Sequence, residues 1–305
     1  MKKISLLTGL IVLNICLDLV SLGSSSASAS ILPRNNLHLE DHPAFVANLT
    51  QVEFNAIIER VEDYYTPVVE SHGGVLRIEK RWDDKTVNAF AERNGNFYNV
   101  SMFGGLARRA EVTHDGFMLV VCHELGHHLA GYPFVSDWAS NEGQSDYFAT
   151  QSCARNIWKD DIATNASFRS HINRVAKKKC DAVYAEAVDQ ELCYRIAAGG
   201  ESLAALLSVL GRQRLPSFAT PDSSEVLVTS HGHPNAQCRL DTYLAGALCT
   251  VEFDENIIPG LKFSDEWLER NLKMEGEALI YSCSQTREEF ALSKRPKCWF
   301  GQLLK

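Results

Sequence analysis

The sequence predicts an α+β protein that is mostly helical, with a small sheet early in the chain followed by a buried helix. Its 305 residues are 45% apolar and 22% charged, which is an ordinary globular composition. Short segments that alternate apolar and polar residues lie between residues 75 and 102, as strands would. Apolar residues at helical spacing dominate the remainder. The formal net charge of −8 argues against a nucleic-acid partner, because such proteins carry basic patches.

The first 29 residues are typical of an export signal. Two lysines precede a mostly apolar stretch over residues 4–20, and Ala27-Ser28-Ala29 then matches a cleavage pattern. The stretch is short and contains Asp18, which favours a signal peptide over a membrane anchor. We therefore predict a periplasmic or secreted bacterial protein with a signal peptide over 1–29. We expect no stable membrane span in the mature chain.

The cysteines also indicate export. Of the nine cysteines, all but Cys16 lie beyond the predicted signal, and an even number in an exported chain predicts disulfides. Eight cysteines allow 105 pairings, so the sequence does not fix the connectivity. Pairings between sequence neighbours are expected, such as Cys180 with Cys193 and Cys283 with Cys298.

The predicted elements begin after a loose polar leader over residues 30–49. Thr50-Gln51-Val52-Glu53 forms a capping box, which opens a helix that Gly73-Gly74 ends. Alternation predicts three strands, over 75–82, 86–91 and 97–102. Asn94-Gly95 predicts a hairpin turn between the last two. The result is a small sheet, antiparallel in part, directly before the next helix.

Thr113 or Asp115 can cap this next helix, whose apolar stripe marks it as a core helix before Gly131 and Pro133 stop it. Further helices are expected over 141–158, 202–210, 234–249 and after Ser264. An extended loop is expected over 212–233. The predicted organisation is a leader over 30–49, one domain over 50–250 and a cysteine-bearing extension over 251–305.

The core helix contains the motif H-E-x-x-H. His123 and His127 are four residues apart, so they lie on one face of a helix, about 6 Å from each other. Two imidazoles at this spacing can share one zinc ion, and Glu124 beside them can act as a general base. The neighbouring His128 points about 100° away from His127, so we leave it out of the site.

A catalytic zinc needs a third protein ligand. The candidate is Glu142, at the start of the following helix, with Asp146 on the same face one turn later. Asp146 can accept the far N–H of a ligating histidine and so fix its orientation. His114, Asp137 and one of the later histidines are the other candidates for the third ligand.

With H-E-x-x-H followed by E-x-x-x-D on a separate helix, the chain resembles the gluzincin metallopeptidases. It is most similar to their HtpX-like and CAAX-protease-like branch. Residues 87–91 resemble the strand that precedes the site in that branch, and residues 102–106 the end of its substrate-binding edge strand. His233-Pro234, with Arg239 six positions after the histidine, matches the branch motif H-P-x-x-x-x-R.

The resemblance covers roughly residues 75–245 and implies a zincin-like domain whose small sheet packs on the H-E-x-x-H helix. It implies one zinc ion and endopeptidase activity on polypeptides, including misfolded exported proteins. It further implies that His233 lines the active site and helps to stabilise the oxyanion, and that Arg239 has a supporting polar role. His231 is the alternative to His233.

We therefore expect an exported zinc endopeptidase in which Glu124 is the general base. An exposed strand edge can hold an extended peptide by main-chain hydrogen bonds, and Phe97 to Met102 is the candidate for that edge. One alternative is a zinc-stabilised binding or chaperone-like module without turnover. Another is a zinc hydrolase that acts on something other than peptides.

Overall fold

The computed structural model describes residues 28–40, 48–261, 267–283 and 290–301. The strands are β1 (Ser28–Ser30), β2 (Val75–Arg81), β3 (Ala89–Asn94) and β4 (Phe97–Phe103). The helices are α1 (Gln51–Ser71), α2 (Gly104–Ala107), α3 (His114–Leu129), α4 (Glu142–Phe148), α5 (Ala154–Trp158), α6 (Ile162–Ser167), α7 (Arg174–Val183), α8 (Ala187–Leu210), α9 (Ala236–Ala247) and α10 (Trp267–Leu279). A π-helical segment, Ala149–Cys153, joins α4 to α5, and a 3-10 turn, Phe168–Ser170, follows α6. The predicted fold class, α+β and mostly helical, is confirmed.

The strands form a single four-stranded mixed sheet in the order β1-β3-β4-β2. β3 and β4 make the expected hairpin, in which Asn94 is opposite Phe97 and Gly95 has a φ of 57°. β2 runs parallel to β4, and β1 runs antiparallel to β3. The prediction that Phe97 to Met102 forms a free edge is wrong, because β4 pairs on both sides.

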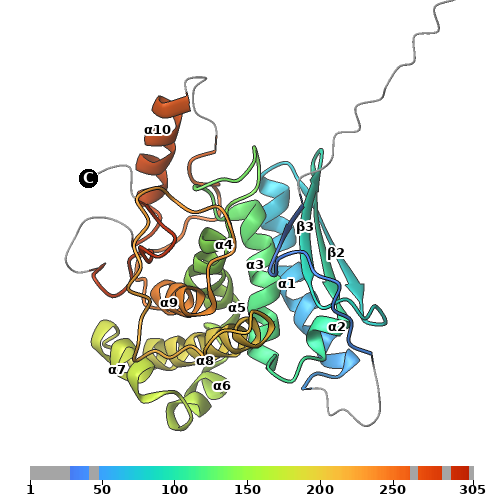
Figure 1. Ribbon diagram of the computed structural model, residues 1–305, viewed down its shortest axis with the longest axis vertical. Coiled ribbons are helices and arrows are strands. Elements are labelled where there is room, and N and C mark those ends of the chain that lie inside the picture. The colour runs from blue at the N-terminus through green and yellow to red at the C-terminus, as the bar shows by residue number, and fades with distance from the viewer. Residues whose placement is uncertain (1–27, 41–47, 262–266, 284–289, 302–305) are drawn as a thin grey trace, which may run out of the picture.

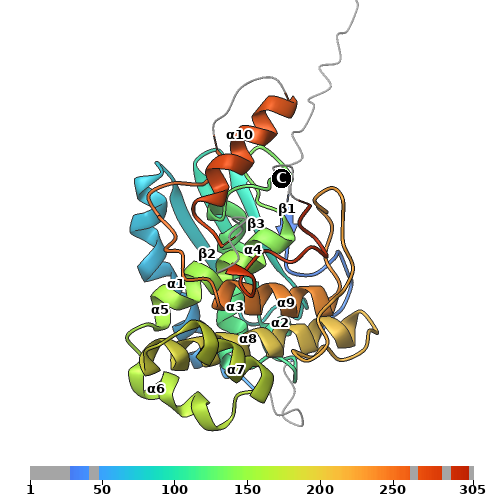
Figure 2. The same cartoon turned by 90° about the vertical axis from the view of Figure 1, so that its left-hand side faces the viewer.

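The sheet and α1 lie on one side of α3, and the helices α4, α8 and α9 lie on the other (Figures 1 and 2). Apolar side chains alternate along β4, so that Tyr98, Val100 and Met102 are buried. The capping box that opens α1 is present, with Thr50 and Glu53 each accepting from the backbone of the other. Because α3 is covered on all sides, every residue from Asp115 to Leu129 is buried.

Part of the predicted leader is packed rather than loose. β1 pairs with the outer edge of β3, and Ile31 and Leu32 are only 1% and 2% exposed. Farther along, Val87 N–H donates to the carbonyl of Leu37. Ile31 and Leu32 therefore anchor the start of this polar stretch by burial, and the backbone of Leu37 anchors it farther along.

Two helix starts differ from expectation. The helix after the 212–233 loop begins at Ala236, with the Asn235 side chain accepting from the backbone N–H of Cys238, so Pro234 precedes the cap rather than occupying the first turn. The helix expected over 202–210 is the end of α8, which begins at Ala187. In the described parts of the chain, only α8 is long and apolar enough to cross a membrane, and 78% of its apolar window is buried inside the protein.

The structure contains four disulfides: Cys122–Cys153, Cys180–Cys193, Cys238–Cys298 and Cys249–Cys283. The expected Cys180–Cys193 bond is confirmed. The prediction of a Cys283–Cys298 bond is wrong. Cys298 pairs with Cys238 in α9, and Cys283 pairs with Cys249 just after α9. These two bonds fasten the C-terminal residues to the helical layer. Four disulfides indicate an oxidising, extracytoplasmic environment.

Candidate metal centre

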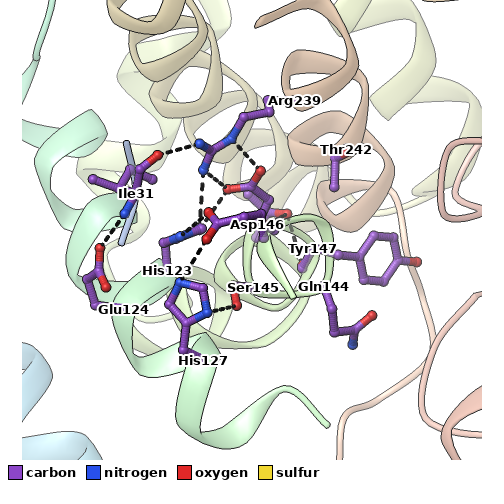
Figure 3. Close-up of polar contacts among 12 residues, drawn as sticks. Ile31, His123, Glu124, His127, Gln144, Ser145, Asp146, Tyr147, Arg239 and Thr242 are labelled. Carbon is purple, nitrogen blue, oxygen red and sulfur yellow. Dashed lines mark hydrogen bonds and ion pairs between the residues drawn. The ribbon is translucent and has the colours of Figure 1, made fainter. Parts of the chain in front are cut away.

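The centre is built on the middle of α3. Thr113 caps this helix by accepting a hydrogen bond from the N–H of Gly116. One helical turn separates His123 from His127, and their rings lie 4.7 Å apart at an interplanar angle of 87°. Both side chains are fully buried. Figure 3 shows the two rings directed toward the same region beside α4.

Glu142, the first residue of α4, brings a carboxylate to the two histidines. The Asn141 side chain caps α4 by accepting from the N–H of Gln144, at 2.9 Å. Glu142 Oε2 lies 3.3 Å from His123 Nε2, and Oε1 lies 3.7 Å from His127 Nε2. Ligand atoms about 2.0–2.1 Å from one zinc ion lie about 3.3 Å from each other, so these separations fit a shared ion.

The three potential ligand atoms have no other partner. His123 Nε2, His127 Nε2 and Glu142 Oε2 are buried and make no hydrogen bond among the described residues. A buried polar atom without a partner costs about 1–3 kcal/mol, so three in one place call for a common explanation. A cation bound by all three would satisfy them together. His123, His127 and Glu142 therefore form a cluster that can bind a metal ion.

The opposite nitrogens of both rings are held by acceptors. Asp146 Oδ1 lies 2.8 Å from His123 Nδ1, and the carbonyl oxygen of Ser140 lies 2.8 Å from His127 Nδ1. A ring that donates through Nδ1 presents an unprotonated Nε2 to a metal. Arg239 in turn donates to both Asp146 oxygens, each at 2.6 Å. Asp146 lies where the helix spacing of the sequence places it, against the far nitrogen of His123. Arg239, to which the resemblance gives a supporting polar role, contacts this carboxylate.

The charges of the ion-free cluster are strongly coupled. Burial acts to lower the pKa of His123, but Asp146 and Glu142 outweigh it and raise this pKa to about 9. Burial lowers the pKa of His127 to about 4. Burial acts to raise the pKa of Glu142, yet His127 and His123 bring it down to about 2. Without an ion, the cluster is thus a carboxylate beside a protonated His123. A divalent cation would replace that proton on binding.

Glu124 is fully buried beside the cluster. Its Oε1 accepts from the backbone N–H of Ile31 at 2.9 Å, and its Oε2 has no partner among the described residues. Burial raises the pKa of Glu124 to about 8, and the charge of Glu142 adds to this effect. A carboxyl group with such a pKa can both accept and donate a proton near neutral pH.

His233 reaches the same region from the segment before α9. Its Nε2 lies 3.6 Å from Glu142 Oε1 and 2.9 Å from the carbonyl oxygen of Ser30, and 28% of its side chain is exposed. The alternative, His231, has no contact with the metal cluster in the described part of the chain. Two of the other candidate third ligands lie elsewhere: His114 is the exposed first residue of α3, and Asp137 is exposed in a loop.

His128 lies outside the cluster, as expected, but it is not a surface residue. Its ring is buried and stacks on Trp138 at 4.8 Å, and Nε2 lies 3.2 Å from the carbonyl oxygen of Asn99. A second group of potential ligands, Asp222, Cys238 and Cys298, does not form a comparable site, because its two sulfurs are bonded to each other.

Two features of the site are not predicted by the sequence. Asn88, in the 87–91 segment that resembles a strand of the metallopeptidases, makes two hydrogen bonds with the main chain of Leu32. The Cys122–Cys153 disulfide ties the residue before His123 to the π-helical segment that follows α4.

Comparisons with known proteins add no further assignment: no family model, no curated protein and no solved structure matches this chain.

Proposed function

We propose that this chain is an exported zinc endopeptidase of the gluzincin type. The observation that carries the proposal is the convergence of three unpartnered, buried ligand atoms next to a buried carboxyl group. Two imidazoles and one carboxylate form the ligand set of a catalytic zinc site that keeps a fourth position open. The four disulfides support a place outside the cytoplasm, periplasmic or secreted, for the mature protein.

Zinc, when bound, would polarise the scissile carbonyl and lower the pKa of a water molecule toward about 7. Glu124 takes the proton of the attacking water and passes it to the leaving amine, a role that its buried position beside the three ligand atoms supports. His233 donates a hydrogen bond to the carbonyl oxygen as negative charge develops there. Asp146 and Arg239 hold His123 in one orientation.

The test separates metal binding from turnover. Glu124→Gln keeps the size of the side chain but cannot accept a proton, so the variant should retain its zinc and lose casein cleavage by about 10²–10⁴-fold. Glu59→Gln, a change at a carboxyl group whose side chain is 58% exposed, is the matched control and should behave as wild type. Unchanged cleavage in Glu124→Gln would end the proposal.

The same experiment distinguishes the alternatives. A zinc-stabilised binding or chaperone-like module would bind the metal and unfold on chelation, yet wild type would cleave no unfolded polypeptide. A zinc hydrolase with another substrate class would ignore peptide libraries and cleave esters or non-peptide amides in a Glu124-dependent manner. Either result would replace the endopeptidase assignment while leaving the metal site intact.

A further inference from the structure

The start of the described chain lies across the metal centre. We refer to residues 28–32 as the N-terminal segment. Its first three residues, β1, pair antiparallel with the outer edge of β3. Ile31 then contacts Glu124 of α3, and Leu32 contacts Asn88. In Figure 3, Ile31 lies between Glu124 and Arg239. Ile31 and Leu32 are almost completely buried. We call the space that the segment fills, between Glu124, Asn88, His233 and Arg239, the cleft.

The cleft holds this segment by its main chain. The carbonyl oxygen of Ser30 lies 2.9 Å from His233 Nε2. The N–H of Ile31 donates to Glu124, and its carbonyl accepts from Arg239 Nη1 at 2.6 Å. Main-chain contacts of this kind, added to strand pairing, are how proteins bind extended peptides. Because these contacts involve only main-chain atoms of Ser30 and Ile31, another peptide with the same backbone path could make them.

Asn88 continues the pattern one residue farther. Its Oδ1 accepts from the N–H of Leu32 at 3.2 Å, and its Nδ2 donates to the carbonyl of Leu32 at 3.2 Å. One amide side chain thus pairs with both main-chain groups of a single residue, as a neighbouring strand would. Asn88 therefore holds Leu32 by its main chain at the point where the chain bends after the extended strand β1.

The peptide unit between Ser30 and Ile31 contacts both proposed catalytic residues. Its carbonyl contacts His233 and its N–H contacts Glu124, the two residues to which the proposed function assigns catalytic roles. A second peptide cannot use either group while the segment is in place. We propose that the N-terminal segment is an internal peptide ligand of the cleft, and that other peptides enter only after it leaves. The term "substrate" for those peptides rests on the proposed function.

The predicted signal cleavage site, after Ala29, lies inside this segment. A cut after Ala29 would remove Ser28 and Ala29, and with them two of the three residue pairs that join β1 to β3. The pairing of Ser30 with Phe90, the contact of the Ser30 carbonyl with His233, and the contacts of Ile31 and Leu32 would remain. Removal of residues 1–29 therefore weakens the hold of the segment, so that export and access to the cleft are linked.

Peptide binding tests the inference without turnover. We would compare the complete chain, a chain that begins at Ser30 and one that begins at Pro33, each zinc-free and folded by circular dichroism. The probe is a fluorescent peptide with the sequence of residues 28–32, and a scrambled peptide is the control. The Kd of the probe should fall by about tenfold or more from the complete chain to the chain from Pro33, because an internal ligand reduces the binding-competent fraction. Equal Kd values in the three chains would overturn the inference.

A second pair of variants covers the case in which the chain from Pro33 does not fold. Ile31→Pro in the complete chain deletes the N–H that donates to Glu124, whereas Ile31→Val retains it. Ile31→Pro should bind the probe more tightly than Ile31→Val, and identical binding would contradict the proposal. If casein is cleaved but probe binding is the same in all variants, the internal-ligand proposal is wrong and the endopeptidase proposal stands. If the probe binds more tightly but no chain cleaves casein, the endopeptidase proposal is wrong and the internal-ligand proposal stands.

Discussion

Asp146 Oδ1 lies 2.8 Å from Nδ1 of His123, and both side chains are completely buried. Arg239 neutralises the same carboxylate through both of its oxygens and is itself buried. Its charge, together with that of His123, keeps the pKa of Asp146 below its ordinary value although burial alone would raise it. The carboxylate therefore stays ionised and orients His123 toward the metal position.

Asp146→Asn should weaken zinc binding by about 10–100-fold, because the amide orients His123 less strongly than a carboxylate does. It should also destabilise the fold, since Arg239 would be left as a buried charge with a neutral partner. Zinc affinity would be measured by competition with a chelator, and stability by thermal unfolding. Asp160→Asn, an exposed acid on the same chain, is the control. Wild-type zinc affinity in Asp146→Asn would refute this role.

The Cys122–Cys153 bond connects the metal helix α3 to the segment after α4, which carries the third ligand. Replacing both cysteines by alanine should cost about 3–4 kcal/mol of stability in the chain-entropy model, since the residues are 31 apart in sequence. It should also weaken zinc binding, because α3 and α4 would be less firmly held together. Removing Cys180 and Cys193, only 13 apart, should cost about 3 kcal/mol and leave zinc affinity unchanged. Equal zinc affinities in the two double variants would show that the first bond is structural only.

The parts of the site that the sequence predicted are those that local geometry determines. The i, i+4 rule places His123 beside His127 and Glu142 beside Asp146 on any helix, whatever the rest of the fold. The strands were likewise visible in the alternation of residues 75–102. That α3 and α4 face each other followed only from the resemblance and from the need for a third ligand, and the structure brings them together.

The parts that the sequence did not predict depend on contacts between distant segments. β1 is three residues long and pairs with a strand about sixty positions later, so it leaves no periodic pattern. The parallel pairing of β2 with β4 buries the strand that was expected to be the free edge. Cys283 lies nearer in sequence to Cys298 than to Cys249, yet the tertiary fold brings it to Cys249.

Acid should weaken the fold partly through Asp161. This carboxylate accepts two hydrogen bonds from Arg60 and one from Arg195. Burial acts to raise the pKa of Asp161, but the two arginines outweigh it and hold the pKa below its ordinary value of 3.8. Because the folded-state pKa is depressed, the stabilisation is present above the unfolded-state pKa and is lost as the pH falls through the folded-state value.

Asp161→Asn should therefore cost roughly 1 kcal/mol at pH 7, a modest value because Arg60 is 43% exposed and solvent screens the pair. Denaturant unfolding of wild type and variant would be followed from pH 7 to pH 2, where the two curves should converge. Asp160→Asn provides the control for loss of a charge without these partners. A constant difference across the whole range would mean that the ionisation of Asp161 contributes nothing.

Gly126 sets how closely the two ligand helices approach. A Cβ built at this position would lie 2.9 Å from Cα and 3.0 Å from the carbonyl oxygen of Ser145 in α4, and backbone atoms cannot swing aside. Gly126→Ala should push α4 away from α3, costing about 1–3 kcal/mol of stability, and displace Glu142 from the two histidines. The displacement of Glu142 should also lower the zinc affinity. Gly232→Ala is the matched control, because a Cβ there meets no atom within 4 Å. If Gly126→Ala kept both the unfolding temperature and the zinc affinity of the control, close packing of α3 on α4 would not be what positions the third ligand.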